Sequence, residues 1–283
     1  MSAQSVRFLK RKIRAVQNIK KIARAMQLVS AAKWKRFNDR LTHFLYFFKE
    51  YKNIVEHLYS YEKYTDYVKS FLQSATDREL IVILSSEKGL CGSYNSNIFR
   101  HFLKLTQNKQ NFYCFPVGKK AIEFCTRNSY PVKFSCAQFL GDISFKNLTS
   151  ILQKVVQTYL EEKMTITVIY THFVNTMVYK VMTDTFLPLQ LEKKEVDEKL
   201  WLYEPRHEMI LDEIFDNFLT YKFLYYFYES LTSEHASRMI AMKNATENAE
   251  DLLLDLTIIY NKARQTMITK ELLDIVGTAE AVK

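Results

Sequence analysis

The segment of this sequence most suggestive of chemistry is the loop Ser85-Ser-Glu-Lys-Gly-Leu-Cys-Gly92, which follows a short apolar run. A glycine-rich loop between a strand and a helix is a common place for a protein to bind phosphate. However, the spacing matches neither G-x-x-x-x-G-K-S/T nor G-x-G-x-x-G. We therefore interpret Gly89 and Gly92 as the residues that permit a tight turn from strand to helix, and we favour this over a nucleotide site.

Thiol and imidazole groups offer little further chemistry. Cys91, Cys114, Cys125 and Cys136 are too widely spaced for a CxxC motif, and the six histidines form no HExxH pattern. Cys91 is either a packed, inert thiol, which we favour, or a reactive thiol near a helix N-terminus. No catalytic constellation stands out, so we expect no catalytic residue, no metal site, no cofactor-binding residue and no cofactor.

The elements around this loop are indicated by the distribution of glycine and proline. All four prolines and four of the five glycines lie between Gly89 and Pro205. Both residue types interrupt helices, so residues 1–88 and the segment after Pro205 predict two long helical arms. An unbroken helix over 206–276 would be about 100 Å long, and it should end near Gly277, a natural C′ residue.

The last arm has the periodicity of a coiled coil. Its apolar and small residues alternate in steps of three and four over four heptads, at Met239, Met242, Thr246, Ala249, Leu253, Leu256, Tyr260, Ala263 and Met267. This spacing predicts a seam that faces a partner helix.

The first arm carries a similar stripe and most of the charge. Its apolar residues fall at Val6, Leu9, Ile13, Val16, Ile19, Ile22, Met26 and Val29. Consecutive steps of three after Val16 indicate a slip in the heptad phase. Residues 1–40 hold twelve lysines and arginines and one acid, so this arm carries the whole excess of the net charge of +9. Beyond residue 33 the stripe becomes aromatic.

We expect the two arms to pair as an antiparallel coiled coil. Acidic residues recur every four positions on the last arm and basic residues every seven on the first, at Glu247, Asp251 and Asp255 and at Arg7, Arg14 and Lys21. Pairing would set these charges against each other, although each exposed ion pair contributes only ~0.2–1 kcal/mol. In the alternative, both stripes are solvated faces.

The middle of the chain alternates strands with helices. Strands are expected at 79–85, 111–117, 130–139, 165–172 and 177–186, and helices at 94–105, 119–127 and 147–163. This order predicts an α/β sandwich built on a mainly parallel, Rossmann-like sheet. The expected fold class is therefore α/β plus a long antiparallel coiled coil formed by the N- and C-terminal helices. The expected domains are 1–75 (N-terminal coiled-coil helix), 76–205 (α/β domain) and 206–283 (C-terminal coiled-coil helix).

Several segments together resemble the gamma subunits of F-type ATP synthases. They are KIRAVQNIKKIARAMQLVSAAK at 12–33, the loop at 85–92, YEP at 203–205, EHASRMIAMKNATENA at 234–249, YNKARQ at 260–265 and ITKEL at 268–272. They cover both arms and anchor the middle in the family's order.

The resemblance implies a rotor, the central-stalk subunit that couples ion-driven rotation of the c-ring to ATP synthesis and hydrolysis on the alpha/beta hexamer. It implies a non-catalytic subunit without an active site of its own. The implied partners are the alpha and beta subunits, the epsilon subunit and the c-ring, with no nucleic acid and with membrane association only through the complex.

Site residues follow from the resemblance position by position. Contacts to beta are implied at Arg24, Met26, Arg264, Gln265 and Thr269. A bearing tip that runs in an apolar sleeve is implied at Leu272, Ile275, Val276, Ala279 and Val282. For Met26 the alternative is packing in the seam, and for Arg264 and Gln265 it is a solvated face.

Parts of the sequence are compatible with two other functions and one other location. A basic arm of this kind is also compatible with a coiled-coil nucleic-acid-binding protein. A third possibility is an enzyme that uses the α/β middle.

The Arg-rich N-terminal segment superficially resembles an organellar transit peptide. However, the resemblance begins within the first dozen residues, and the chloroplast gamma insertion is absent. These features favour a bacterial protein, peripheral on the cytoplasmic face of the inner membrane.

Overall fold

A computed structural model describes the chain except for residues 1–2, 61–64, 74–75, 138–144, 194–206 and 282–283. The chain packs as two units. We call residues 1–30 with 238–283 the coiled-coil unit and residues 31–237 the sheet unit. Helices α1 (Ala3–Ser60) and α6 (His207–Ala281) each pass through both units. The three domain bounds expected from the sequence stay a prediction.

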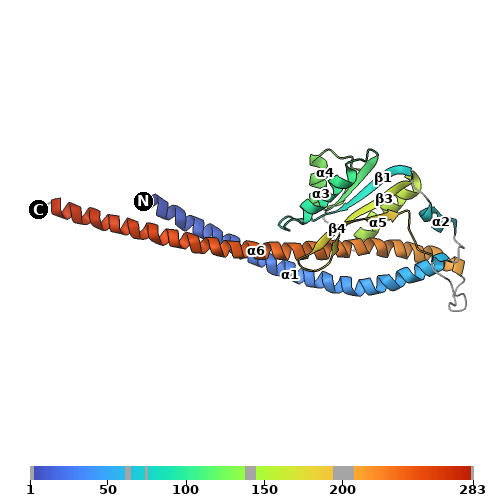
Figure 1. Cartoon of the computed structure of the whole chain (residues 1–283), viewed down its shortest axis with the longest axis horizontal. Helices are drawn as coiled ribbons and strands as arrows, with labels where there is room; N and C mark the ends of the chain where they lie inside the picture. The colour runs from blue at the N-terminus through green and yellow to red at the C-terminus, as the bar shows by residue number, and fades with distance from the viewer. Residues whose placement is uncertain (1–2, 61–64, 74–75, 138–144, 194–206, 282–283) are drawn as a thin grey trace. The chain divides into compact units, whose positions relative to one another are not determined.

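In the coiled-coil unit, α1 and α6 pack against each other in antiparallel directions, as the sequence predicts (Figure 1). All nine residues of the α6 stripe are buried or half-buried, and Ala263 is fully buried. Val16 of α1 packs with Ala249 and Leu256 of α6 at the centre of a small apolar cluster. The alternative that this α6 stripe is a solvated face is therefore wrong.

The predicted slip in the heptad phase of α1 is wrong. Val16, Ala23 and Ser30 are buried at steps of seven, so the seam keeps one phase. Ile19 and Ile22 are 58% and 61% exposed, because a residue one position away from the seam is rotated by about 100° around the helix. The apolar pattern was misleading because the true seam positions after Val16 are small or polar.

Two smaller expectations are also wrong. One ion pair between the two helices joins Lys20 to Glu250, which are not among the predicted charges. Acids spaced every four residues drift around a helix, whereas bases spaced every seven stay near one face, so the two sets cannot remain opposed. Helix α6 also continues through Gly277 to Ala281, since glycine costs only about 1 kcal/mol in a helix.

The sheet unit contains a four-stranded sheet in the order β2-β1-β3-β4. Strands β1, β2 and β3 are parallel, and β4 pairs antiparallel with β3. The strands are β1 (Thr76–Leu84), β2 (Phe112–Val117), β3 (Met164–Phe173) and β4 (Tyr179–Leu187). The shorter helices are α2 (Asp66–Leu72), α3 (Tyr94–Thr106), α4 (Lys119–Arg127) and α5 (Phe145–Glu162). The α/β prediction is confirmed, and α2 was missed.

The strand expected at 130–139 is wrong for the residues that the structure describes there. Val132 and Cys136 form isolated parallel bridges to Cys114 and Val117 of β2. A step of three residues along β2 thus corresponds to a step of four residues along the segment, and this mismatch interrupts the ladder. Residues 138–139 lie outside the described part of the chain.

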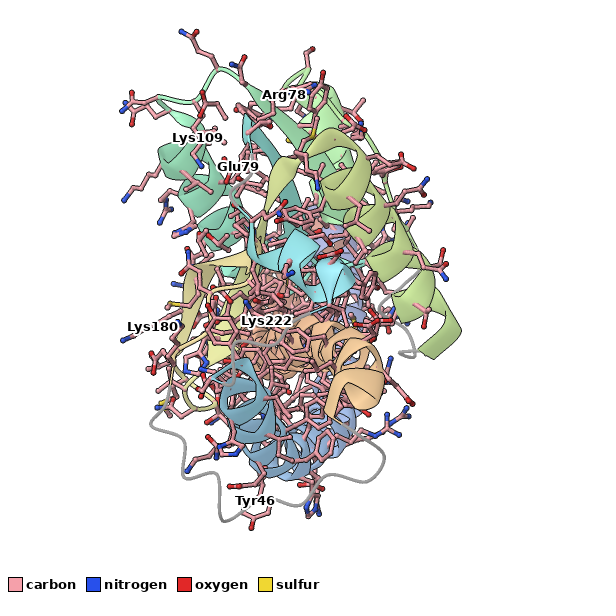
Figure 2. The ribbon with its side chains drawn as sticks, turned by 90° about the vertical axis from the view of Figure 1, so that its right-hand side faces the viewer. Tyr46, Arg78, Glu79, Lys109, Lys180 and Lys222 are labelled. Carbon is pink, nitrogen blue, oxygen red and sulfur yellow. The ribbon has the colours of Figure 1, made fainter. Side chains whose placement is uncertain are left out.

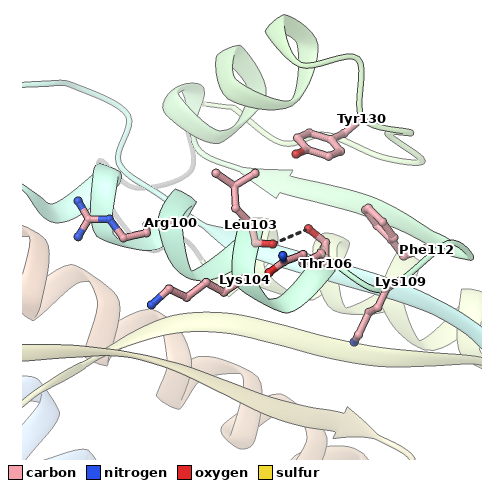
Figure 3. Close-up of a pocket in the computed structure, with 8 residues that line it drawn as sticks. Arg100, Leu103, Lys104, Thr106, Lys109, Phe112 and Tyr130 are labelled. Carbon is pink, nitrogen blue, oxygen red and sulfur yellow. Dashed lines mark hydrogen bonds between the residues drawn. The ribbon is translucent and has the colours of Figure 1, made fainter.

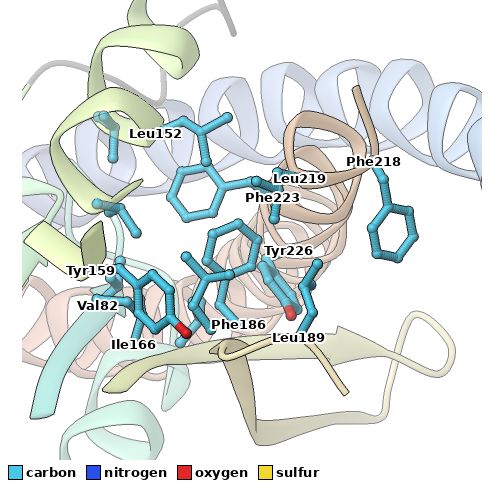
Figure 4. Close-up of a cluster of buried hydrophobic side chains, with 14 of the residues drawn as sticks. Val82, Leu152, Tyr159, Ile166, Phe186, Leu189, Phe218, Leu219, Phe223 and Tyr226 are labelled. Carbon is cyan, nitrogen blue, oxygen red and sulfur yellow. The ribbon is translucent and has the colours of Figure 1, made fainter. Parts of the chain in front are cut away.

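Both faces of the sheet are covered by helices, which explains the continuous apolar run in β1. Ile81 and Ile83 face α3 and α4. Leu80, Val82 and Leu84 belong to a larger core that includes α5 and the parts of α1 and α6 in this unit. Figure 4 shows Phe186, Phe223 and Tyr226 among the side chains of this core.

Aromatic side chains join α1 to α6 within the sheet unit. The rings of Phe37 and His235 stack with centroids 5.4 Å apart, and those of Phe48 and Phe218 stack at 5.9 Å. The hydroxyl of Tyr51 donates a hydrogen bond to the carbonyl oxygen of Ile214 at 3.1 Å. Later residues of α1 thus meet earlier residues of α6, so the helices are antiparallel here too.

The buried seam predicts the effect of a proline at Ala249. Ala249→Pro removes a helical hydrogen bond and introduces a steric clash, at a cost of about 3 kcal/mol or more. We expect a lower melting temperature and faster proteolysis of the two arms in the purified chain. Thr257→Ala, at an exposed position of the same helix, should leave both unchanged. An unaltered melting temperature for Ala249→Pro would contradict a packed, continuous helix.

Candidate functional site

The loop at 85–92 forms a tight turn whose polar groups bond to nearby protein atoms. The hydroxyl of Ser86 donates to the carbonyl of Lys88 at 2.8 Å, and its amide donates to Asn95 Oδ1 at 3.2 Å. Gly92 has a φ of 57°, in the left-handed region, as a sharp turn requires. The predicted tight turn is confirmed for Gly92, whereas the role predicted for Gly89 is wrong, because the other residue of the loop in the left-handed region is Leu90, with a φ of 62°.

Ser85 connects this loop to the start of α4. Its hydroxyl donates to the carbonyl of Val117 at 3.1 Å and accepts from the amide of Ala121 at 2.8 Å. Gly118 lies against it with a φ of 95°. A Cβ on Gly118 would come within 2.3 Å of the Ser85 carbonyl oxygen, whereas a Cβ on Gly89 would have no neighbour within 4 Å. The loop is thus a packed joint between β1, β2 and α4.

The thiols lie mostly in the interior. Cys91 is buried, and its sulfur accepts a hydrogen bond from Asn95 Nδ2 at 3.1 Å. Cys114 and Cys125 are both fully buried in the core against α3 and α4. A hydrogen bond with the Cys125 thiol and burial together raise the pKa of the Cys114 thiol. Among the described residues, no three His, Cys, Asp or Glu side chains cluster as metal ligands would.

In one surface hollow of the sheet unit the basic side chains do not converge on a common point. Figure 3 shows this hollow of about 550 Å³, in which Arg100, Lys104 and Lys109 extend from different points of its wall. Lys109 is paired with Glu79, and Figure 2 shows the two side by side. Figure 2 also shows Lys180 at the outside of the molecule. The sheet unit therefore offers no evident active site among its described residues.

The residues implied as beta contacts lie on the surface of the coiled-coil unit. Arg24, Arg264, Gln265 and Thr269 are exposed, and Met26 is half-buried beside the seam. The hydroxyl of Thr269 donates to the carbonyl of Gln265 at 3.0 Å within the helix. All five side chains reach solvent, so a partner can contact them.

An apolar flank on this unit was not recognised from the sequence. The flank consists of Ile19, Ile22 and Val29, which α1 exposes beside the seam. The apolar spacing of α1 predicts all three in the stripe that faces α6. Their phase mismatch with Val6, Leu9, Ile13 and Val16 was the available signal that they form a separate stripe.

The end of α6 is also apolar and exposed. Leu272, Ile275 and Val276 are each more than half exposed. Ala279 lies in the helix, but its side chain is not among those described, and Val282 lies outside the described residues. The described part of the expected tip is thus a helix end with uncovered apolar side chains.

Comparison with known proteins connects this architecture to one class. The family model described as ATP synthase matches residues 5–282. The ATP synthase gamma chain of Stenotrophomonas maltophilia strain R551-3 is 34% identical over 288 residues, covering 98% of this chain and 99% of that relative. The gamma chain of Syntrophobacter fumaroxidans is 32% identical, with 99% of both chains covered.

Solved structures of mitochondrial ATP synthases contain chains that share the fold. A chain in the Euglena gracilis mitochondrial OSCP/F1/c-ring structure matches with a TM-score of 0.73 at 20% identity, covering 99% of this chain and 95% of that chain. A chain of the Tetrahymena thermophila central stalk and c-ring matches with a TM-score of 0.59 at 26% identity, covering 79% and 99%.

These matches define a central-stalk subunit that combines a helical coiled coil with an α/β domain. The chain belongs to the family of ATP synthase gamma chains. Its function is that of a rotor subunit, and the resemblance seen in the sequence is confirmed. The alternative of a nucleic-acid-binding coiled coil finds no support in these matches. No helix within the described residues has the length and apolar character needed to span a membrane.

The contact of Gly118 with Ser85 predicts different effects for two glycines. Gly118→Ala should lower the free energy of unfolding by about 1–3 kcal/mol, because the new Cβ strains the backbone and displaces Ser85. Gly89→Ala is the matched control and should change it by less than about 0.5 kcal/mol. Urea denaturation of both variants checks this. Equal stability of the two would contradict the packed joint.

Proposed function

We propose that the coiled-coil unit is the part of the rotor that turns inside the alpha/beta hexamer, with its exposed apolar flank and tip in contact with that hexamer. The observation that carries this proposal is the coexistence of a well-packed seam with uncovered isoleucines beside it. The seam holds the helices together without Ile19 and Ile22, which are more than half exposed. Apolar side chains grouped in this way on a surface indicate an interaction site.

Polar residues supply the more specific contacts in this proposal. Arg24 and Met26 of α1 and Arg264, Gln265 and Thr269 of α6 would meet the beta subunits. The basic excess of residues 1–40 suits acidic surfaces on those partners, because complementary charge guides association. A rotor shifts three equivalent catalytic sites only if its contacts differ in energy between their conformations. Directional contacts of arginine and glutamine provide such differences.

The tip has a different role in the same proposal. Leu272, Ile275 and Val276, with Ala279 and Val282, would turn within an apolar sleeve of the hexamer. Apolar contacts have little directional preference, so such a sleeve permits rotation. The exposure of the first three side chains supports this assignment.

The sheet unit is proposed to face the membrane-side partners, namely the epsilon subunit and the c-ring. In this arrangement residues 76–205 are the α/β domain, and residues 1–75 and 206–283 are the arms. The chain would then be peripheral on the cytoplasmic face of a bacterial inner membrane, attached through the complex. Its relatives from Stenotrophomonas and Syntrophobacter are bacterial gamma chains.

The beta contacts predict a loss of turnover without a loss of folding. Arg264→Ala and Gln265→Ala should each lower ATP hydrolysis by the complex reconstituted with alpha and beta subunits. Their melting temperatures as free chains should not change, because both side chains are exposed. Lys262→Ala, at another exposed position of the same helix, is the control. Full turnover in both variants would contradict the assigned contacts.

A double substitution in the apolar flank tests the proposed contact between the coiled-coil unit and the alpha/beta hexamer. Ile19→Ser together with Ile22→Ser should weaken co-purification with alpha and beta subunits and leave the folded chain intact. Undiminished recovery of the complex would show that this flank is not an interface.

A further inference from the structure

We propose that a polar face of α6 takes the place of a missing strand at the end of β3, and that its directional hydrogen bonds lock the sheet to the helix against rotation. This inference rests on the proposed function for its mechanical role, because such a lock is needed only if the helix carries torque. The bonds themselves lie within the sheet unit and are independent of any partner.

The missing strand arises because β3 is longer than its neighbour on one side. Pairing between β1 and β3 ends at Ile83 and Ile169, and β1 itself ends at Leu84, where the chain turns into the loop at 85–92. Strand β3 continues to Phe173 and remains paired with β4 on its other side. The backbone groups of β3 beyond Ile169 that face the β1 side therefore need other partners.

Side chains of α6 supply those partners. The amide of Thr171 donates to Ser230 Oγ at 3.2 Å, and its carbonyl accepts from Ser233 Oγ at 3.3 Å. Two residues further, the amide of Phe173 donates to Glu229 Oε2 at 2.6 Å. In an extended strand the backbone groups of residues two apart point to the same edge. Three successive edge groups are thus bonded to one helix.

The same face of α6 also holds the chain that leaves β1. Ser237 Oγ donates to the carbonyl of Cys91 at 2.7 Å, and the hydroxyl of Tyr94 donates to the carbonyl of Ser230 at 3.1 Å. Ser230, Ser233 and Ser237 are spaced by three and four residues, which places them on one side of the helix. All three are buried. The helix therefore bridges the end of β3 and the loop after β1.

Toward the N-terminal end of α6, polar contacts also join this helix to β4. Lys222 Nζ donates to the carbonyl of Thr185 at 3.1 Å and lies 3.3 Å from Asp184 Oδ2. The hydroxyl of Tyr226 donates to the same carboxylate. Lys222 is half-buried, and Figure 2 labels it near the middle of the view. From Lys222 to Ser237 the face spans roughly 22 Å along the helix, at about 1.5 Å per residue.

These hydrogen bonds differ from the contacts of the apolar core because their strength depends on angle. A hydrogen bond weakens steeply when its angle falls below about 120°, whereas apolar contacts adjust to sliding. Rotation of α6 about its axis would misalign every bond of this face at once. Ser230, Ser233 and Ser237 are positioning residues in this account, because they fix the angle of the helix and touch no substrate.

The test compares the double variant Ser230→Ala and Ser233→Ala with Thr220→Ala. The hydroxyl of Thr220 donates to the carbonyl of Asp216 within α6, so the control removes a hydroxyl from the same helix without touching the sheet. Residue-resolved amide exchange of the full chain is measured first. We expect the Thr171 amide to exchange about tenfold faster in the double variant, and the Ile169 amide to stay unchanged.

The second measurement uses the complex reassembled in membrane vesicles. The double variant should hydrolyse ATP but transport fewer ions per ATP than the wild-type and Thr220→Ala complexes, because the helix slips against the sheet. An unchanged Thr171 exchange rate would overturn the lock. Faster exchange with unchanged transport per ATP would overturn its mechanical role. If the double variant does not accumulate, Ser230→Ala alone is subject to the same two criteria.

Failure of the proposed function would look different. In that case the wild-type chain itself would not restore coupled transport with the alpha and beta subunits. The exchange result on the full chain would remain valid for the hydrogen bonds.

Discussion

Small side chains in the seam between α1 and α6 are the constraint on which the coiled-coil unit depends. Ala23 and Ser30 on one helix and Ala249 and Ala263 on the other are buried. Small residues at seam positions allow two helices to approach closely. Because the seam is occupied by these residues, the isoleucines at neighbouring positions are left on the surface. The same packing that joins the helices therefore also creates the apolar flank.

The sheet unit is joined to the same helices by two kinds of contact. On one side, aromatic rings of α1 and α6 stack and share a large apolar core with the sheet. On the other, serines and a glutamate of α6 bond to backbone groups of β3. The apolar core supplies most of the stabilisation through the area it buries. The hydrogen bonds fix the angle of α6 relative to the sheet, and a rotating subunit requires a fixed angle of this kind.

A buried carboxylate within this polar face is consistent with such a role. Burial raises the pKa of the Glu229 carboxyl, while the amide of Phe173 and the ring of His172 oppose that rise. An unpaired carboxylate in such a place would be costly. Its hydrogen bond to the strand end makes the buried position tolerable and ties the helix to that strand.

The sequence by itself determined the two long helices, the seam of α6 and the strand–helix order of the middle, because these depend on local spacing. The α6 stripe is correct in all nine positions. Tertiary structure decided which stripe of α1 faces α6, since Ala23 and Ser30 carry no hydrophobic signal and are buried only by their partner helix. Tertiary structure also decided which side chains bond to the backbone groups at the end of β3, because the bonded residues lie some sixty positions apart in the sequence. No local pattern records which side chain will satisfy an unpaired strand edge.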